Sequence, residues 1–211
     1  MTKEVFYSVK NESEHTIVIN KSKFITTLAP IDGYEDALEK IKIVSKKYSD
    51  ATHNCYAFIS NESASEQRFS DDGEPQGTAG MPMLDVLKKR KVCKTLAIVT
   101  RYFGGVKLGA NGLVSAYSSS VAQALDNAGL VKNEWADIAQ ITLGYGECKK
   151  AEEICSKAGG QNVEINYDKD VTLTVALPSN TSKETLEKII DLTQGKAKIN
   201  LISSGYFQFE I

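Results

Sequence analysis

Residues 71–82 read DDGEPQGTAGMP, and residues 100–109 read TRYFGGVKLG. Each segment contains three glycines beside charged residues, and the apolar sequence LAIV at 96–99 lies between the two segments. That apolar run is too continuous for a half-exposed edge, so it predicts a central strand over 92–100 that is buried on both faces. Because glycine allows positive φ and close backbone approach, the flanking loops are typical of a contact surface, although tight turns are the simpler alternative.

Strand and helix patterns alternate around this central strand. β-branched and aromatic residues predict further strands at 4–9, 15–20, 23–28, 53–60 and 67–70. Apolar residues at helical spacing predict helices over 34–48, from Pro82 to about 90, and over 110–127, the last ending at Gly129. Asp32 and Glu35 fit a capping box for the first helix. We therefore expect an N-terminal domain over 1–132 built as a mixed α/β sandwich.

The second half has a different order of elements. After a linker predicted at 131–134, the sequence indicates strands and helices in the order βαββαβ, with Thr181 and Glu184 as a capping box for the last helix. The expected segments are 136–143, 147–158, 162–167, 171–177, 181–193 and 198–211. This order is typical of a ferredoxin-like domain, so the prediction is an α+β protein with its second domain at 133–211.

Composition and charge restrict the class of protein. The chain has 211 residues, is 42% hydrophobic and carries a net charge of −2, as is ordinary for a globular protein. No apolar run is long enough for a membrane span and no signal peptide is apparent, so we expect a cytoplasmic protein without a membrane partner. Residues 1–132 carry 17 basic against 15 acidic side chains and residues 133–211 carry 8 against 12, so any contact with nucleic acid is expected in the first half.

The basic side chains cluster at one place. Lys88, Lys89, Arg90 and Lys91 form the basic run, with Lys94 close behind. Such a run can contact phosphates, or it can be the solvated end of a helix whose dipole favours cations.

The glycine segments predict a phosphate or nucleic-acid site. Arg101 and Lys107 bracket Gly104 and Gly105 ahead of a helix start, so two cations and free backbone N–H groups could converge on a phosphate. The candidates also include aromatic residues that could stack on bases and a second loop that offers amides: Tyr102, Phe103, Gly77, Thr78 and Gly80. Neither a P-loop nor a dinucleotide fingerprint is present, so no cofactor is expected.

Three interpretations of the acidic residues Asp71, Asp72 and Glu74 stay open. They could hold magnesium with a phosphate, form only a turn, or pair with Arg101 and lock the two loops together. A turn is favoured over a metal site. His53 and Cys55 lie two residues apart on one strand, too far for a catalytic dyad. The four cysteines predict reduced core thiols rather than disulfides or zinc ligands.

Residues 71–82 and 100–109, with Gly112, Leu113, Ala116 and Tyr117, closely resemble the signature of the IMPACT family in its bacterial YigZ-like branch. The resemblance implies an N-terminal domain similar to the second domain of small-subunit ribosomal protein five. It also implies a ferredoxin-like C-terminal domain similar to one in elongation factor G. Eukaryotic members regulate translation through a scaffold protein of a kinase pathway, but they do so with an additional N-terminal domain, so that partner is not expected here.

Three hypotheses for function follow in order of preference. The first is a non-enzymatic RNA- or ribosome-binding protein that regulates translation. The second is a protein-interaction module whose loops shape a docking face. The third is a metal-dependent enzyme acting on a phosphorylated small molecule through Asp71, Asp72 and Glu74. Fold likeness to ribosome-associated domains is analogy and does not decide among them.

Overall fold

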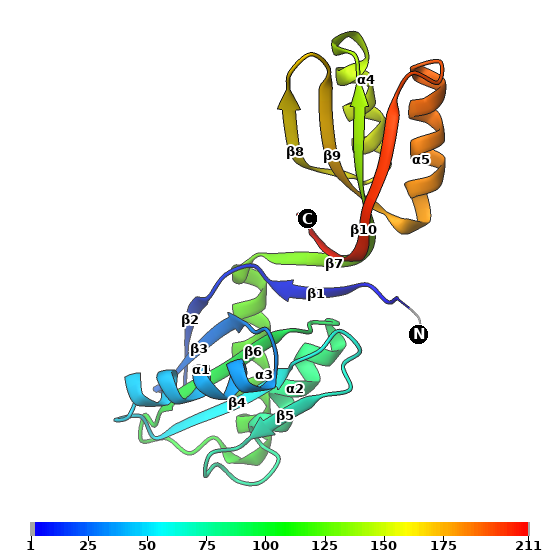
Figure 1. The fold of residues 1–211 in the computed structure, drawn as a ribbon. Coiled ribbons are helices and arrows are strands. Elements are labelled where there is room, and N and C mark those ends of the chain that lie inside the picture. Colours follow the sequence, from blue (N-terminus) through cyan, green and yellow to red (C-terminus); the bar gives the residue numbers. More distant parts are fainter. Residues whose placement is uncertain (1–2, 211) are drawn as a thin grey trace. The chain divides into compact units, whose positions relative to one another are not determined.

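A computed structural model of the chain describes residues 3–210 and shows two compact units (Figure 1). One unit is formed mainly by residues 6–132 and the other by residues 133–209. The mixed α+β fold expected from the sequence is confirmed, and each unit is described by itself.

The sheet of the N-terminal unit has the order β2-β3-β6-β4-β5, and neighbouring strands pair antiparallel. The strands are β2 (Ser13–Ile19), β3 (Ser22–Pro30), β4 (His53–Ile59), β5 (Gln67–Ser70) and β6 (Thr95–Tyr102). β6 is central and buried from Thr95 to Arg101, as its continuous apolar sequence predicted. A further short strand, β1 (Phe6–Val9), is held by hydrogen bonds from Tyr7 N to Lys91 O and from Cys93 N to Tyr7 O.

Helices cover both faces of this sheet. α1 (Tyr34–Lys47) buries Ala37 and Val44 against Phe58, Leu96 and Ile98. α2 (Gly80–Lys89) and α3 (Gly109–Ala128) pack on the other face, where the Tyr117 ring meets Phe24 edge-on and the Cys55 thiol lies under the Tyr117 hydroxyl. Alternate residues of β4 and β6 therefore face different helices, which explains why β6 is apolar throughout.

The C-terminal unit has the βαββαβ order predicted for a ferredoxin-like domain. Its elements are β7 (Leu130–Leu143), α4 (Tyr145–Lys157), β8 (Gln161–Tyr167), β9 (Val171–Pro178), α5 (Ser179–Leu192) and β10 (Lys198–Phe209). The strand order is β8-β9-β7-β10, and residues of α4 and α5 share one core with β7 and β9, among them Ala151, Ile189, Ile141 and Leu173. Figure 1 labels these elements.

Three local predictions differ from the structure. Residues 131–134, the predicted linker, are part of the long strand β7, although the division between the two units does fall among them, between 132 and 133. Neither capping box forms: Gly33 precedes α1 and Pro178 precedes α5, and neither start has a side-chain cap. Asp36 accepts the Asp32 N–H instead, and the Thr181 hydroxyl donates to Ala158 O. Each helix starts at a residue other than the one the capping pattern assumed, so the capping geometry cannot form. The Gly129 stop is confirmed, with φ of 69°.

Candidate functional site

The acidic turn closes on itself through Asp71. Its carboxylate accepts hydrogen bonds from Gly77 N (2.8 Å), Ala79 N (3.0 Å) and Gly80 N (2.8 Å). The N-cap residue of α2, Ala79, has no side-chain oxygen that could accept the N–H groups of the first turn. Asp71, which is remote in sequence, accepts N–H groups at this helix start instead. The hydroxyl of the buried Thr78 donates to Pro75 O at 2.6 Å. The amides of this second glycine loop therefore already have an acceptor within the protein.

Asp72 and Glu74 point to different partners. Asp72 is exposed with φ of 42°, and its Oδ2 accepts the Asn54 N–H at 2.6 Å. Glu74 is buried, and its Oε1 accepts from Arg101 Nη1 (2.6 Å) and from the Tyr117 hydroxyl (2.7 Å). Of the three interpretations left open by the sequence, the pairing of the acidic turn with Arg101 is present, and it is made by Glu74. Within residues 3–210, no three His, Cys, Asp or Glu side chains gather as a metal site.

A buried polar network extends from Glu74. His53 Nδ1 lies 2.7 Å from Asp72 O, and its Nε2 lies 3.9 Å from Glu74 Oε2. The Cys55 thiol donates to Asp71 O at 3.0 Å. Burial raises the pKa of Cys55 to about 12 and also raises the pKa of the Tyr117 hydroxyl. Neither group is therefore prepared to act as a nucleophile near neutral pH.

Arg101 belongs to the interior, although the sequence placed it beside a loop. Arg101 is a residue of β6 and is only 5% exposed. Its Nη2 lies 3.4 Å from Ser22 Oγ. Its guanidinium lies 5.4 Å from the centre of the Phe24 ring and 5.6 Å from that of the Phe103 ring. The adjacent Tyr102 is half-buried and donates its hydroxyl to Asp50 at 2.8 Å. Arg101 thus links the acidic turn to the base of the following loop.

Residues 103–109 form what we call the glycine loop, and its first half is fixed in position. Phe103 N donates to Thr52 Oγ1 at 3.1 Å, and Gly104 N donates to Ser22 Oγ at 3.2 Å. A Cβ atom at Gly104 would lie 2.0 Å from the Lys21 backbone, so no other residue fits at this position without movement of the chain.

The second half of the glycine loop is open. Lys107 is exposed, and Phe103 and Val106 expose 47% and 40% of their surface. Gly105 and Gly109 have φ of 82° and 71°, and no other group lies within 4 Å of the position that a Cβ atom would take at either residue. α3 starts at Gly109 with neither a side-chain cap nor an acidic residue in its first turn. The loop therefore presents a cation, an aromatic ring and the positive end of a long helix to solvent.

The basic run lies at the other end of α3. Lys88 and Lys89 end α2 and are exposed, while Arg90 pairs with Asp126 in the last turn of α3. Lys91 is exposed at φ of 52°, and Lys94 lies 3.4 Å from Glu62. Asp126 is 17 residues after Gly109, so the helical rise puts it about 25 Å from the loop. The basic run and Lys107 therefore lie near opposite ends of α3, an arrangement that could not be read from the sequence.

Comparison with known proteins gives the family. The profile of the "Impact N-terminal domain" matches residues 20–125, and that of a "Domain of unknown function (DUF1949)" matches residues 141–196. The chain belongs to the IMPACT family. IMPACT family member YvyE of Bacillus subtilis is 40% identical over 92% of this chain and 89% of its own length. IMPACT family member YigZ of Escherichia coli is 37% identical over 86% and 90%.

A solved structure described as that of a hypothetical protein has the same fold. It is 33% identical to this IMPACT family member, with a TM-score of 0.59, and the match covers 95% of this chain and 98% of the other. The expected membership of the IMPACT family is therefore confirmed, and the similarity extends over both units of the chain.

Sequence reasoning missed the residues that hold the site together. Ser22 and Thr52 anchor the glycine loop, and Tyr117 and His53 complete the network around Glu74. Tyr117 gave a usable signal, because a tyrosine on the buried face of a helix needs a partner for its hydroxyl. Ser22 and Thr52 gave none, since their pairing depends on the packing of distant segments.

Proposed function

We propose that this IMPACT family member is a non-enzymatic RNA- or ribosome-binding protein that regulates translation, with the glycine loop as its contact surface. The proposal rests on one observation: the glycine loop is fixed in position at Gly104, while the same loop exposes the side chains of Phe103 and Lys107 to solvent. A pre-formed loop loses little conformational entropy when it binds.

The groups at the tip match the two parts of a nucleotide. Lys107 and the free amides at the start of α3 suit a phosphate, while the Phe103 ring suits an unpaired base. The basic run supplies exposed cations about 25 Å away along α3, a spacing that favours an extended nucleic acid over a small phosphorylated molecule.

Within this proposal, Arg101 positions the loop and does not contact the ligand. Its guanidinium is paired with Glu74 and lies against the Phe103 ring. The internal partners of Asp71, Asp72 and Glu74 weigh against the metal-dependent enzyme, because each carboxylate already accepts a hydrogen bond within the protein and Asp71 does so through both of its oxygens. Protein binding remains the second candidate, because Phe103 and Val106 are apolar and exposed.

The test is binding of the full chain to purified ribosomes and to bulk ribosomal RNA across a salt series. Lys107→Ala should reduce the slope of log K against log salt by about 0.7 to 0.9, the value for one lost phosphate contact. Phe103→Ala should weaken binding at every salt concentration by the equivalent of about 1–3 kcal/mol, with an unchanged slope. Lys183→Ala, a change at a side chain that is 91% exposed on α5, is the control and should alter neither quantity.

Two results would overturn the proposal. One is failure of the wild-type protein to bind ribosomes or RNA near physiological salt. The other is binding that ignores both loop variants. Capture of a partner protein that survives nuclease treatment and depends on Phe103 would support the second candidate instead.

A further inference from the structure

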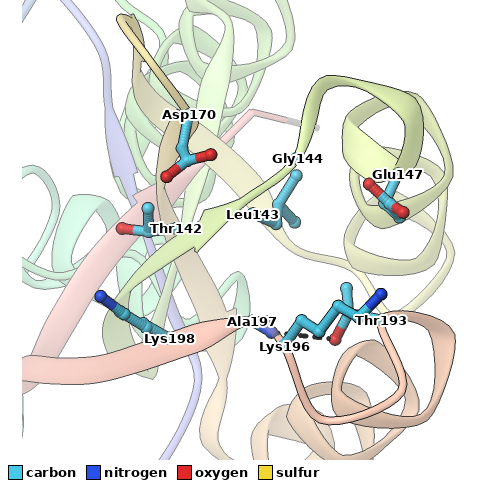
Figure 2. A pocket seen from close by; sticks show the side chains of 9 residues that line it. All are labelled: Thr142, Leu143, Gly144, Glu147, Asp170, Thr193, Lys196, Ala197 and Lys198. Atoms are coloured by element: carbon cyan, nitrogen blue, oxygen red, sulfur yellow. Dashed lines mark hydrogen bonds between the residues drawn. The ribbon is translucent and has the colours of Figure 1, made fainter.

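The C-terminal unit contains a cavity of about 270 Å³ at one end of its sheet (Figure 2). It lies between the end of β7, the start of α4 and the start of β9. The turn that connects α5 to β10 closes its remaining side. Nine residues line it: Thr142, Leu143, Gly144, Glu147, Asp170, Thr193, Lys196, Ala197 and Lys198. The volume is slightly below the roughly 300–1,000 Å³ usual for sites of drug-sized ligands, so it suits a smaller molecule.

One side of the cavity is held in shape by internal hydrogen bonds. The buried Thr193 hydroxyl donates to Ile189 O at 2.9 Å and accepts the Ala197 N–H at 3.1 Å. This closes the turn after α5, where Gly195 has φ of 77°. Leu143 is buried and Ala197 half-buried, and together they give an apolar surface of a few carbon atoms.

Charges of both signs surround that surface. Glu147 and Asp170 supply two carboxylates, and Lys196 and Lys198 supply two ammonium groups, as Figure 2 shows around Leu143 and Gly144. Among the residues the structure describes, none of these four side chains lies within 4.0 Å of an oppositely charged partner. α4 begins after Gly144 without a side-chain cap hydrogen bond, and Glu147 in its first turn offsets the positive potential of the helix start.

This arrangement discriminates among ligand classes. A simple anion would be attracted by the two lysines but repelled by both carboxylates, and a simple cation would meet the opposite balance. A molecule that carries both charges a few bonds apart can satisfy both kinds of group at once. We propose that the cavity binds a small zwitterion of the free α-amino acid class.

The lining residues then have distinct roles. Lys196 and Lys198 take the carboxylate, Asp170 and Glu147 take the ammonium group, and Leu143 and Ala197 contact a short aliphatic side chain. The site is formed wholly within the C-terminal unit, so it does not depend on the glycine loop or on RNA binding.

The test separates the zwitterion from each of its charges. The full chain, labelled with ¹⁵N, is titrated with L-leucine, with 4-methylpentanoate, which has only the carboxylate, and with 3-methylbutylamine, which has only the ammonium group. Leucine at about 10 mM, the range in which weak metabolite sites are filled, should shift the amide resonances of Gly144 and residues 196–198. Each half-molecule should bind at least about tenfold more weakly.

Variants locate the binding. Lys196→Ala and Asp170→Asn should each weaken leucine binding about tenfold, while Lys183→Ala, elsewhere on α5, should leave it unchanged. Unchanged dispersion of the remaining resonances establishes that each variant is folded. The proposal is overturned if leucine, alanine and glycine shift none of the cavity resonances, if a half-molecule binds as well as leucine, or if the shifts map elsewhere.

Discussion

Replacing Arg101 with methionine should strongly destabilise the N-terminal unit. Methionine approximately keeps the volume of the arginine stem but removes the guanidinium that pairs with Glu74 at 2.6 Å. Both side chains are almost fully buried, with 6% and 3% of their surface exposed. The Glu74 carboxylate would then be buried beside the Tyr117 hydroxyl at 2.7 Å and His53 Nε2 at 3.9 Å, without the cation that balances its charge.

The magnitude follows from that unpaired charge. Removing one partner of a buried ion pair costs about 3–5 kcal/mol, whereas an exposed pair contributes much less. For a domain of this size, each kcal/mol lowers Tm by roughly 3 °C, so a decrease of about 9–15 °C is expected.

Differential scanning calorimetry of the full chain measures this decrease and can resolve separate transitions of the two units. Lys188→Ala is the control, because it breaks the exposed pair with Glu184 at 2.6 Å and should hardly change Tm. The double change Arg101→Met with Glu74→Gln should recover more than half of the lost stability, since it removes the buried charge and keeps an acceptor for Tyr117. A decrease no larger than that of the control, or no recovery in the double variant, would refute this reasoning.

Three further changes test other parts of the site. Tyr117→Phe removes a donor to the Glu74 carboxylate and should lower the free energy of unfolding by about 1.5–3 kcal/mol in urea titrations; an unchanged value would contradict the network. Gly104→Ala places a Cβ 2.0 Å from the Lys21 backbone, so it should cost about 1–3 kcal/mol and also weaken RNA binding, and normal binding would show that the loop shape is unimportant. Because burial raises the pKa of Cys55 to about 12, this thiol should react with an aromatic disulfide at pH 8 only after urea unfolds the chain; fast labelling of the native protein would be the contrary result.

Much of the fold could be predicted because local patterns and packing agree. The unbroken apolar run of β6 belongs to a strand with helices on both faces, and Gly129 ends α3 where its positive φ is needed. The βαββαβ order was sufficient to predict the ferredoxin-like unit, because few arrangements of these elements bury all their apolar faces.

The side chains of the site were harder to place. Side chains alternate between the two faces along β6, so Arg101 lies on the same buried face as Ala97 and Val99. Its burial therefore follows from the continuation of the strand to Tyr102. The sequence instead suggested that the strand ends at 100. The separation of Lys107 from the basic run depends on how α2 packs against α3, which no local pattern contains.

Ultraviolet cross-linking of the wild-type protein bound to ribosomes, followed by mass spectrometry of the RNA-linked peptides, tests most directly whether the glycine loop contacts RNA. Nucleotide adducts should map to the peptide containing Phe103 and Lys107, and Phe103→Ala should remove them. Adducts confined to residues 133–209, or none above the level of an unbound protein, would contradict the assignment of the glycine loop as the contact surface.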